Sequence, residues 1–575
     1  MSVAATSAIV RLPVWRARLV LAGLIVGFAL LIGRSVYLQG MRTGYLQEKG
    51  EQRYSRVIEV PATRGRILDR SGEALAVSTP VKSIWAIPED FATTSAERLQ
   101  LARELDMPLA ELNRKLDAEG RDFVYLKRQV SPETAERIAK LGISGLYQQR
   151  EYRRYYPGGE VTAHVVGFTG VDDKGQEGVE LAHQSRLGGK FGSRRVIKDR
   201  LGKIIEDVGS IRAAQDGGDL TLSIDSKIQS LAYAVLKDSV ARHKAKAGAL
   251  VAIDPRTGEI IALANIPSFN PNNRTRLGGA QLRNRVITDS FEPGSTLKPF
   301  AIALALDRGQ LTPETVIDTA AGSLQLANHT IRDVHGESAL TVAQIIQKSS
   351  NVGAARIALG LPREEMWSLY HRVGFGSVPD LGFPGAAAGR LRPWKTWLPI
   401  EQATMAYGHG ISVSLVQLAR AYSVFARDGD LAPLALEKVS GPVAGTQIIS
   451  AQSARNMRAM LESATQLGGT APRARIMGWR VAGKTGTAHK QENGAYSASR
   501  YISSFVGFAP VSNPRLIIAV AIDEPNAGQH YGGMVAAPVF AQVMQGALRL
   551  LGVPHDAPLS PIELPGEAQE VREGT

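Results

Sequence analysis

The sequence of 575 residues contains no cysteine. This absence excludes disulfide bonds, zinc–thiolate and iron–sulfur sites and any cysteine nucleophile. The sequence also lacks long blocks of basic residues and zinc-finger, RNP or basic-zipper spacings, so its net charge of +13 does not indicate nucleic-acid binding. With 44% hydrophobic and 21% charged residues, the composition is that of a globular protein, and the length predicts about two to four domains.

One long apolar run lies near the N-terminus. Residues 19–33 carry no charge, and Arg34 is the only charged residue from there through residue 38. A helix of about 20 such residues is long enough to cross a bilayer. Three arginines and no acidic residue precede the run, which predicts a cytoplasmic N-terminus. No small-residue cleavage site follows it, so we expect an uncleaved anchor rather than a signal peptide or a buried core helix.

The rest of the chain divides into two modules. No second apolar span follows the first, so these modules are expected outside the cytoplasm. Short β-like and helical runs alternate in the first module, and a Gly-Gly pair marks its end. The predicted organisation is a cytoplasmic tail (1–18), a transmembrane helix (19–38), a linker (39–56), an elongated α+β module (57–218), a second α+β module (219–553) and a disordered acidic tail (554–575).

The second module has the pattern of a mainly antiparallel sheet flanked by helices. Its first part contains a capped helix from about Ser226 and a hairpin around the turn PRTG. Its last part contains three successive strand patterns, WRVAGKTGTA, YISSFVGFAP and RLIIAVAIDEP, and a helix over about 537–551. A sheet formed from both ends of the module predicts the α+β class.

Ser295 and Lys298 form the only Ser-x-x-Lys pair in the chain. The turn FEPG precedes them and a run with helical apolar spacing follows, so both side chains are predicted on one face of a helix N-terminus. A serine hydroxyl needs a base to become a nucleophile, and a buried amine can lose its charge and accept that proton. The alternative is an ordinary helix cap beside a solvated lysine.

Two further motifs follow in order. Ser349-Ser350-Asn351 begins 54 residues after Ser295, between two helical patterns. Lys484-Thr485-Gly486-Thr487 begins 135 residues after Ser349, on a predicted strand where Gly486 would allow a close backbone approach. Each motif alone is weak, whereas the ordered set of three favours nucleophilic catalysis by Ser295.

The three motifs resemble those of the penicillin-binding protein and serine β-lactamase superfamily. Their flanks, FEPGSTLKPF, KSSNVG, GKTGTA and GGMVAAPVF, are similar to those of the septal class B penicillin-binding proteins, the FtsI type. The segment RGRILDRSG at 64–72 is similar to the pedestal motif of that class. The resemblance implies that 57–218 is the pedestal (dimerisation-type) domain and that 219–553 is the transpeptidase domain.

The resemblance also implies roles for single residues. Ser295 would be the acylated nucleophile, Lys298 its general base, and Ser349 a proton relay close to Lys484. The substrate-binding residues would be Asn351, Thr485, Gly486 and Thr487, and the backbone N–H groups of Ser295 and Thr487 would form the oxyanion hole. No cofactor is implied. No metal is expected either, because the histidines lack metal-ligand spacing.

The implied function is the cross-linking of peptidoglycan stem peptides during septal wall synthesis by a D,D-transpeptidase that β-lactams inhibit. The implied location is the bacterial inner membrane at the division septum, with a periplasmic catalytic domain. Implied partners are a SEDS-family glycosyltransferase and other divisome proteins, and nucleic acid is not among them. The alternatives are a lateral-wall transpeptidase, a β-lactamase or carboxypeptidase, a bifunctional glycosyltransferase–transpeptidase, and a catalytically silent scaffold or β-lactam sensor.

Some residues have no clear role in this scheme. His409 stands where the family is expected to have Tyr, and His489 follows the KTGTA motif. Both are interpreted as packed or surface histidines, because neither has an evident partner in the sequence. Arg64, Gly65, Asp69 and Arg70 of the pedestal motif are interpreted as structural, acting through ion pairs and turns. The alternative is a direct contact with a partner.

Overall fold

The computed structural model describes residues 13–41, 44, 55–117, 123–198, 204–275, 277–492, 494–563 and 571. It confirms the α+β class, and the chain forms two compact units, each built from separate segments. Unit 1 comprises Met1–Ala62, Val81–Glu151 and Lys190–Gln215, and unit 2 comprises Thr63–Pro80, Tyr152–Gly189 and Asp216–Thr575.

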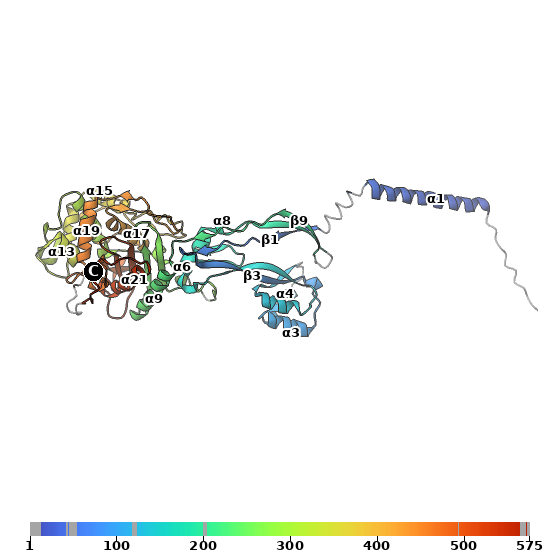
Figure 1. Ribbon diagram of the computed structural model, residues 1–575, viewed down its shortest axis with the longest axis horizontal. Coiled ribbons are helices and arrows are strands. Elements are labelled where there is room, and N and C mark those ends of the chain that lie inside the picture. The colour runs from blue at the N-terminus through green and yellow to red at the C-terminus, as the bar shows by residue number, and fades with distance from the viewer. Residues whose placement is uncertain are drawn as a thin grey trace, which may run out of the picture. The chain divides into compact units, whose positions relative to one another are not determined.

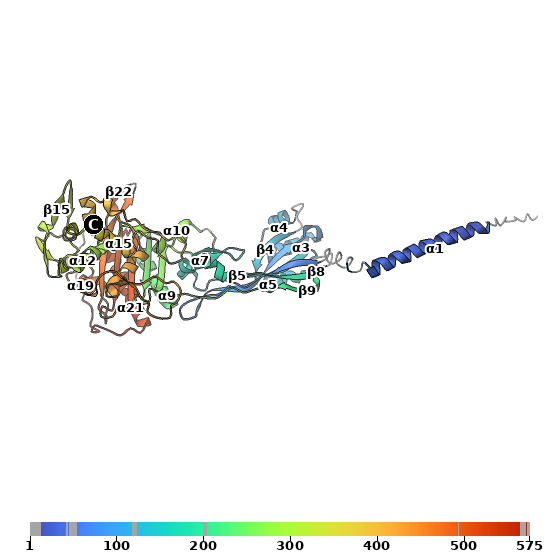
Figure 2. The same cartoon turned by 90° about the horizontal axis from the view of Figure 1, so that it is seen from above.

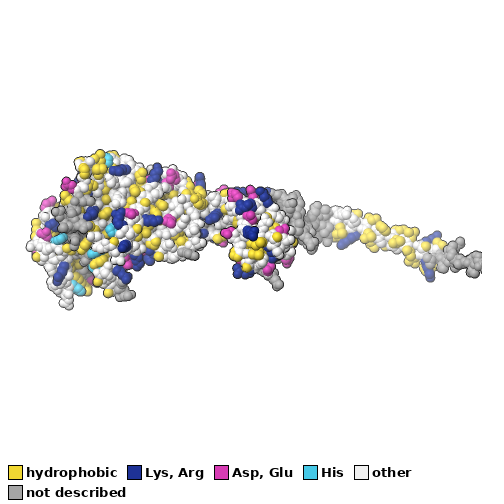
Figure 3. All heavy atoms as spheres, turned by 90° about the horizontal axis from the view of Figure 1, so that it is seen from below, with side chains coloured by type: hydrophobic (Ala, Val, Ile, Leu, Met, Phe, Trp, Pro, Cys, Tyr) yellow, Lys and Arg dark blue, Asp and Glu magenta, His cyan; other side chains and the backbone are white. Residues whose placement is uncertain are grey.

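The apolar N-terminal run forms helix α1 (Val14–Val36), which continues into a π-helical turn, η1 (Tyr37–Met41). The most apolar 18 residues have a mean hydropathy of 2.2, and none of this stretch is buried by other residues. Figure 3 shows hydrophobic side chains along the helix and basic side chains near both of its ends. The helix is long and apolar enough to cross a membrane and fits a single-pass anchor.

Two sheets contribute strands to unit 1. The first is antiparallel, in the order β1 (Ser55–Val60), β8 (Gly192–Lys198), β9 (Ile204–Arg212). In the second, β3 (Ala74–Ala86) pairs with β4 (Val124–Val130) and β5 (Leu146–Tyr155). Because alternate strand residues point to opposite faces, Ile84 and Ala86 of β3 share a core with α3 (Ser95–Glu104), α4 (Leu109–Leu116) and α5 (Pro132–Ala139). A 3-10 turn, η2 (Pro88–Asp90), follows β3.

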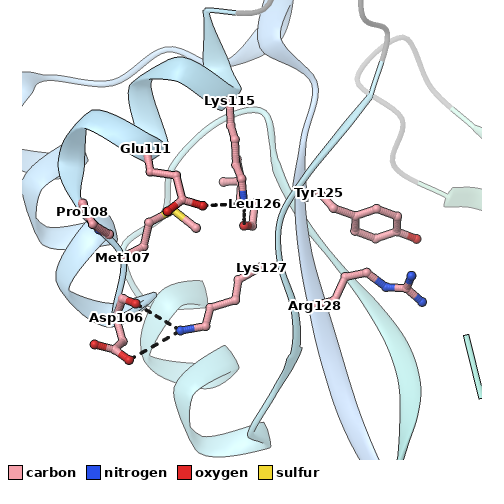
Figure 4. A pocket seen from close by; sticks show the side chains of 9 residues that line it. All are labelled: Asp106, Met107, Pro108, Glu111, Lys115, Tyr125, Leu126, Lys127 and Arg128. Carbon is pink, nitrogen blue, oxygen red and sulfur yellow. Dashed lines mark hydrogen bonds and ion pairs between the residues drawn. The ribbon is translucent and has the colours of Figure 1, made fainter. Parts of the chain in front are cut away.

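A pocket of about 420 Å³ lies between α4, β4 and the residues that join α3 to α4 (Figure 4). Lys115 Nζ donates to the backbone oxygen of Leu126 at 2.8 Å and lies 3.3 Å from Glu111. Lys127 Nζ donates to the backbone oxygen of Leu105 just after the end of α3. Both amino groups therefore satisfy carbonyls of neighbouring elements, and none of the predicted site residues lies in this pocket.

The first segments of unit 2 surround the motif at 64–72. Here β2 (Ile67–Leu68) lies between β3 and β10 (Leu220–Thr221). Short elements complete the region: η3 (Gly159–Val161), α6 (Ala163–Val166), β6 (Phe168–Thr169), β7 (Gly175–Glu177), α7 (Gly178–Ala182) and α8 (Gln184–Leu187).

Arg64 of this motif lies in a buried group of charges, which agrees with its interpretation as a structural residue. Arg64 Nε lies 2.6 Å from one carboxylate oxygen of Glu180, and Arg154 Nε lies 2.7 Å from the other. All three side chains are at most 1% exposed. A Cβ on Gly65 would lie 2.2 Å from the backbone oxygen of Gly218, so only glycine allows this approach.

The largest sheet of unit 2 is antiparallel throughout and confirms the predicted strands (Figure 2). The turn PRTG joins two of its strands, as predicted. Residues from both ends of the module meet in the order β12 (Ile260–Ile266), β11 (Ala247–Ile253), β23 (Leu516–Asp523), β22 (Ala495–Ala509), β21 (Ala482–Glu492).

Helices cover both faces of this sheet (Figures 1 and 2). Because alternate strand residues point to opposite faces, Leu250 packs with α9 (Ser226–Arg242) and α21 (Ala537–Leu550), whereas Val251 belongs to the core of the other face. The predicted final helix is thus confirmed. That other core includes α11 (Arg285–Thr288), α12 (Lys298–Asp307), α13 (Val342–Lys348), α14 (Asn351–Leu359), α15 (Arg363–Arg372), α16 (Pro399–Met405), α17 (Leu415–Ala421), α18 (Ser423–Ala426) and α19 (Ala451–Ser463).

Smaller elements connect these layers. They are α10 (Gly279–Leu282), α20 (Gly532–Val535), the paired strands β13 (Ser290–Phe291) and β18 (Val413–Ser414), β14 (Val316–Asp318) and β17 (Ala339–Thr341), β15 (Ser323–Leu326) and β16 (His329–Arg332), and β19 (Asp430–Leu431) and β20 (Thr446–Gln447). Residues 554–563 of the predicted tail pack through Trp479, whose Nε1 donates to the backbone oxygen of Pro554 at 2.9 Å. Most of the remaining tail, 564–570 and 572–575, lies outside the described residues, as do residues 1–12 and most of the linker.

Candidate active site

Ser295 lies in a 3-10 turn, η4 (Gly294–Leu297), immediately before α12. Lys298 Nζ donates to Ser295 Oγ at 2.9 Å, so the predicted one-turn spacing brings the two groups together. Both residues are buried, at 3% and 0% exposure. The α-helix begins only at Lys298, three residues later than the pattern predicts, because Gly294 has a positive φ of 57° and the turn before the helix is tighter.

Ser349 ends α13 in the left-handed conformation, with φ 63° and ψ 40°. This conformation is costly for a residue other than glycine, by about 1–3 kcal/mol. It turns the hydroxyl of Ser349 toward two amino groups: Lys298 Nζ and Lys484 Nζ each donate to Ser349 Oγ at 2.9 Å. Lys298 Nζ also donates to the backbone oxygen of Ser349 at 2.5 Å. The left-handed conformation of Ser349 thus places its hydroxyl within hydrogen-bond distance of both lysines.

The KTGT motif lies on β21, at the edge of the large sheet. Thr485 Oγ1 lies 2.9 Å from Thr470 Oγ1, and Thr487 Oγ1 accepts from the backbone N–H of Gly532 at 3.0 Å. A Cβ on Gly486 would lie 2.5 Å from Ser504 Oγ and 2.8 Å from the backbone oxygen of Pro293. Glycine is therefore needed for the turn of the nucleophile to approach β21, as the sequence suggested.

The three motifs consequently meet in one buried, hydrogen-bonded chain. It runs from Ser295 through Lys298 and Ser349 to Lys484. Such a chain can pass a proton between hydroxyl and amine without solvent. Asn351 begins α14 directly after it. Within the described part of the chain its buried Oδ1 has no hydrogen-bond partner, so this oxygen can still accept a hydrogen bond from a ligand amide.

Asp333 holds the second motif in place, and the sequence analysis did not identify it. Its carboxylate accepts from Ser350 Oγ at 2.5 Å and from the backbone N–H groups of Asn351 and Val352 at 2.5 and 3.0 Å. A carboxylate at a helix N-terminus is favourable for α14. No motif in the sequence marks this residue, because its partners follow it by 17 to 19 positions.

His409 is packed, not exposed, and lies within the electrostatic reach of Lys298. Its ring is 5.2 Å from that of Tyr407 and 5.8 Å from that of Tyr496. Burial, with smaller contributions from the charges of Lys298 and His489, lowers the pKa of His409 to about 4. The imidazole is therefore neutral near pH 7.

His489 is tied to its own hairpin, since its Nδ1 lies 2.8 Å from the backbone oxygen of Ser497. Among the described residues, no group of three or more His, Asp or Glu side chains could hold a metal ion.

Two family models match the chain. Residues 248–545 match the penicillin binding protein transpeptidase domain, and residues 59–222 match the penicillin-binding protein dimerisation domain. Together the matches cover both modules predicted outside the cytoplasm.

Similar proteins span nearly the whole chain. The probable peptidoglycan D,D-transpeptidase PenA of Neisseria gonorrhoeae is 44% identical over 549 residues, covering 95% of this chain and 94% of that protein. The peptidoglycan D,D-transpeptidase FtsI of Escherichia coli K12 is 42% identical over 550 residues, covering 94% and 93%. Among solved structures, the transpeptidase domain of Burkholderia pseudomallei penicillin-binding protein 3 is 49% identical with a TM-score of 0.55, covering 59% of this chain and 98% of that one.

Proposed function

The chain belongs to the penicillin-binding protein transpeptidases and is a serine-type peptidoglycan D,D-transpeptidase, and on this premise we propose that Ser295 carries its reaction. The substrates are peptidoglycan stem peptides, and β-lactams bind as their mimics. The assignment of Ser295 as the nucleophile rests on the buried chain of hydrogen bonds from Ser295 through Lys298 and Ser349 to Lys484.

The first half-reaction forms an acyl-enzyme. Ser295 Oγ attacks the carbonyl carbon of the penultimate D-Ala while Lys298 Nζ, in its neutral form, takes the hydroxyl proton. The backbone N–H groups of Ser295 and Thr487 stabilise the oxyanion. The C–N bond then breaks, and the departing D-Ala amine receives a proton through Ser349, whose hydroxyl lies between the two lysines.

The second half-reaction transfers the acyl group. The amine of a neighbouring stem peptide attacks the ester carbonyl, loses its proton to the same chain and releases Ser295. Asn351 would hold the peptide amide of the donor, while Thr485 and Thr487 would bind its terminal carboxylate beside Lys484. Gly486 contributes by admitting the turn of the nucleophile, since any side chain there would collide with Ser504 and Pro293.

Labelling with a fluorescent penicillin tests the assignment directly. Wild type is expected to become covalently labelled, and Ser295→Ala is expected to lose labelling completely, because the variant lacks the hydroxyl that Lys298 contacts at the turn before α12. Ser290→Ala changes an exposed serine of the same segment and should label as wild type does. Labelling that survives Ser295→Ala would reject Ser295 as the nucleophile, and an unlabelled wild type would favour a silent scaffold.

Asp333→Asn is expected to slow acylation about tenfold, since it weakens charge-assisted hydrogen bonds that place Ser349 and Asn351. The rate constant for penicillin acylation measures this effect. Asp318→Asn is the matched control, because Asp318 is 68% exposed and pairs with the partly exposed side chain of Arg356, away from the N-terminus of α14. An Asp333 variant that acylates at the wild-type rate would show that α14 is positioned without this carboxylate.

The finer aspects of function rest on the similarity to FtsI. We propose a cytoplasmic N-terminus, a periplasmic catalytic domain at the division septum, and a SEDS-family glycosyltransferase among divisome partners. The proposed boundaries are those of the sequence: anchor 19–38, pedestal 57–218 and transpeptidase 219–553. A fluorescent fusion in dividing cells should gather at midcell, whereas a uniform sidewall signal would indicate a lateral-wall enzyme.

A further inference from the structure

The last two residue pairs of the β21–β22 hairpin are separated by a break from the pairs that carry the KTGT motif. The ladder is regular to the pair His489–Tyr501 and resumes at Gln491–Tyr496. One residue on β21 therefore stands against four on β22, residues 497–500. We call the described ends of the two strands, residues 491–492 and 494–496, the flap. A break of this kind leaves the flap without a continuous ladder to fix it to the sheet.

Glu292 joins the flap to the turn of the nucleophile. This residue precedes Ser295 by three positions. Its carboxylate accepts from Gln491 Nε2 at 3.1 Å and from Tyr496 Oη at 3.1 and 3.2 Å. The same carboxylate accepts from the backbone N–H of Gly410 at 2.9 Å. Two segments far apart in the sequence thus donate hydrogen bonds to one carboxylate.

The carboxylate is desolvated by this arrangement, and burial raises the pKa of Glu292 above its ordinary value. The flap itself is exposed: Tyr496 has a relative exposure of 50%. Besides the hydrogen bonds to Glu292, the ring of Tyr496 lies 5.8 Å from that of His409. An exposed hairpin end with few contacts to the rest of the unit opens locally at low cost.

The turn of the nucleophile has anchors independent of Glu292. Thr296 Oγ1 donates to the backbone oxygen of Pro293 at 2.7 Å, and Tyr422 Oη donates to the backbone oxygen of Thr296 at 2.7 Å. Lys298 holds the hydroxyl itself. Loss of the Glu292 contacts should therefore release the flap and leave Ser295 in place.

We propose that Glu292 is a positioning residue that clasps the flap beside Ser295 and so limits the size of acyl side chains that reach the nucleophile. The proposal deepens the proposed function, on which its kinetic consequence depends. Ligands with small side chains enter past the closed flap, and ligands with bulky side chains require it to open. The flap thereby selects among acyl donors before chemistry begins.

The test compares full-length wild type with Glu292→Ala, Glu292→Gln and Tyr496→Phe in detergent. Two penicillins serve as probes, one with a small and one with a bulky acyl side chain. Glu292→Ala and Tyr496→Phe are expected to raise the bulky-to-small ratio of acylation rates about fivefold, the equivalent of one lost hydrogen bond. Glu292→Gln keeps an accepting oxygen and should retain the wild-type ratio. Tyr155→Phe is the matched control, because Tyr155 has a similar exposure, 49%, and lies outside the flap.

Amide hydrogen exchange supplies a readout that does not depend on acylation. In Glu292→Ala, amide exchange at Gly410 and in residues 489–500 is expected to be faster than in wild type. In Tyr496→Phe, exchange in residues 489–500 is expected to be faster. Exchange in α12 should stay unchanged in both variants. Unchanged exchange, or equal rate changes for both penicillins, would overturn the clasp. If wild type fails to acylate at all, the proposed function fails, while the exchange measurement still decides whether Glu292 holds the flap. Should Glu292→Ala not fold, Tyr496→Phe decides alone.

Discussion

Replacing Lys298 by methionine is expected to slow acylation by a penicillin at least about a thousandfold, in the upper part of the range for loss of a general base. Methionine has a similar length and no amine, so the hydroxyl of Ser295 loses its partner at 2.9 Å. The chain to Ser349 and Lys484 is broken at the same point. The time course of covalent labelling of the full-length protein in detergent gives the rate constant.

Lys348→Met is the matched control for this prediction. Lys348 is adjacent to Ser349 in sequence, but its amino group lies 2.6 Å from Glu337 and its side chain is 30% exposed. Its loss should change the acylation rate by no more than about twofold. If Lys298→Met melts like wild type and still acylates within about tenfold of the wild-type rate, another group must take the proton from Ser295.

Local features of the site were predictable from the sequence because they depend on neighbouring residues. The spacing of Ser295 and Lys298 places both on one helical face, and Gly486 stands where two backbones approach. The strand and helix patterns of the second module were likewise predictable from alternation and from the helical period. That the three motifs converge came from the family resemblance, since no spacing rule relates positions 295, 349 and 484.

The supporting carboxylates were not predictable. Asp333, Glu292 and Glu180 look in the sequence like ordinary surface acids, because isolated acidic residues are usually solvated. Their partners lie up to 204 positions away, so only tertiary packing reveals them. The same holds for His409, whose burial against Tyr407 and near Lys298 gives it a lowered pKa that the sequence could not indicate.

The Arg64–Glu180–Arg154 group has the second large expected effect, on stability rather than on chemistry. Glu180→Gln keeps the shape of the side chain and removes its charge. Two guanidinium groups, both at most 1% exposed, are then left without their shared carboxylate. Breaking a buried ion pair in this way costs about 3–5 kcal/mol. The thermal midpoint of the full-length protein in detergent should therefore fall by at least about 6 °C.

The exposed pair of Arg186 and Glu437 provides the comparison for Glu180→Gln. Its atoms lie 2.9 Å apart, but both side chains are nearly half exposed, at 48% and 46%. Because solvent screens such a pair, Glu437→Gln should cost no more than about 1 kcal/mol. The folded fraction of Glu180→Gln should acylate at the wild-type rate, since Glu180 has no contact with the Ser295 chain. Equal midpoints for the two variants would mean that hydrogen bonds of the guanidinium groups to backbone oxygens, rather than the carboxylate, hold the pedestal motif.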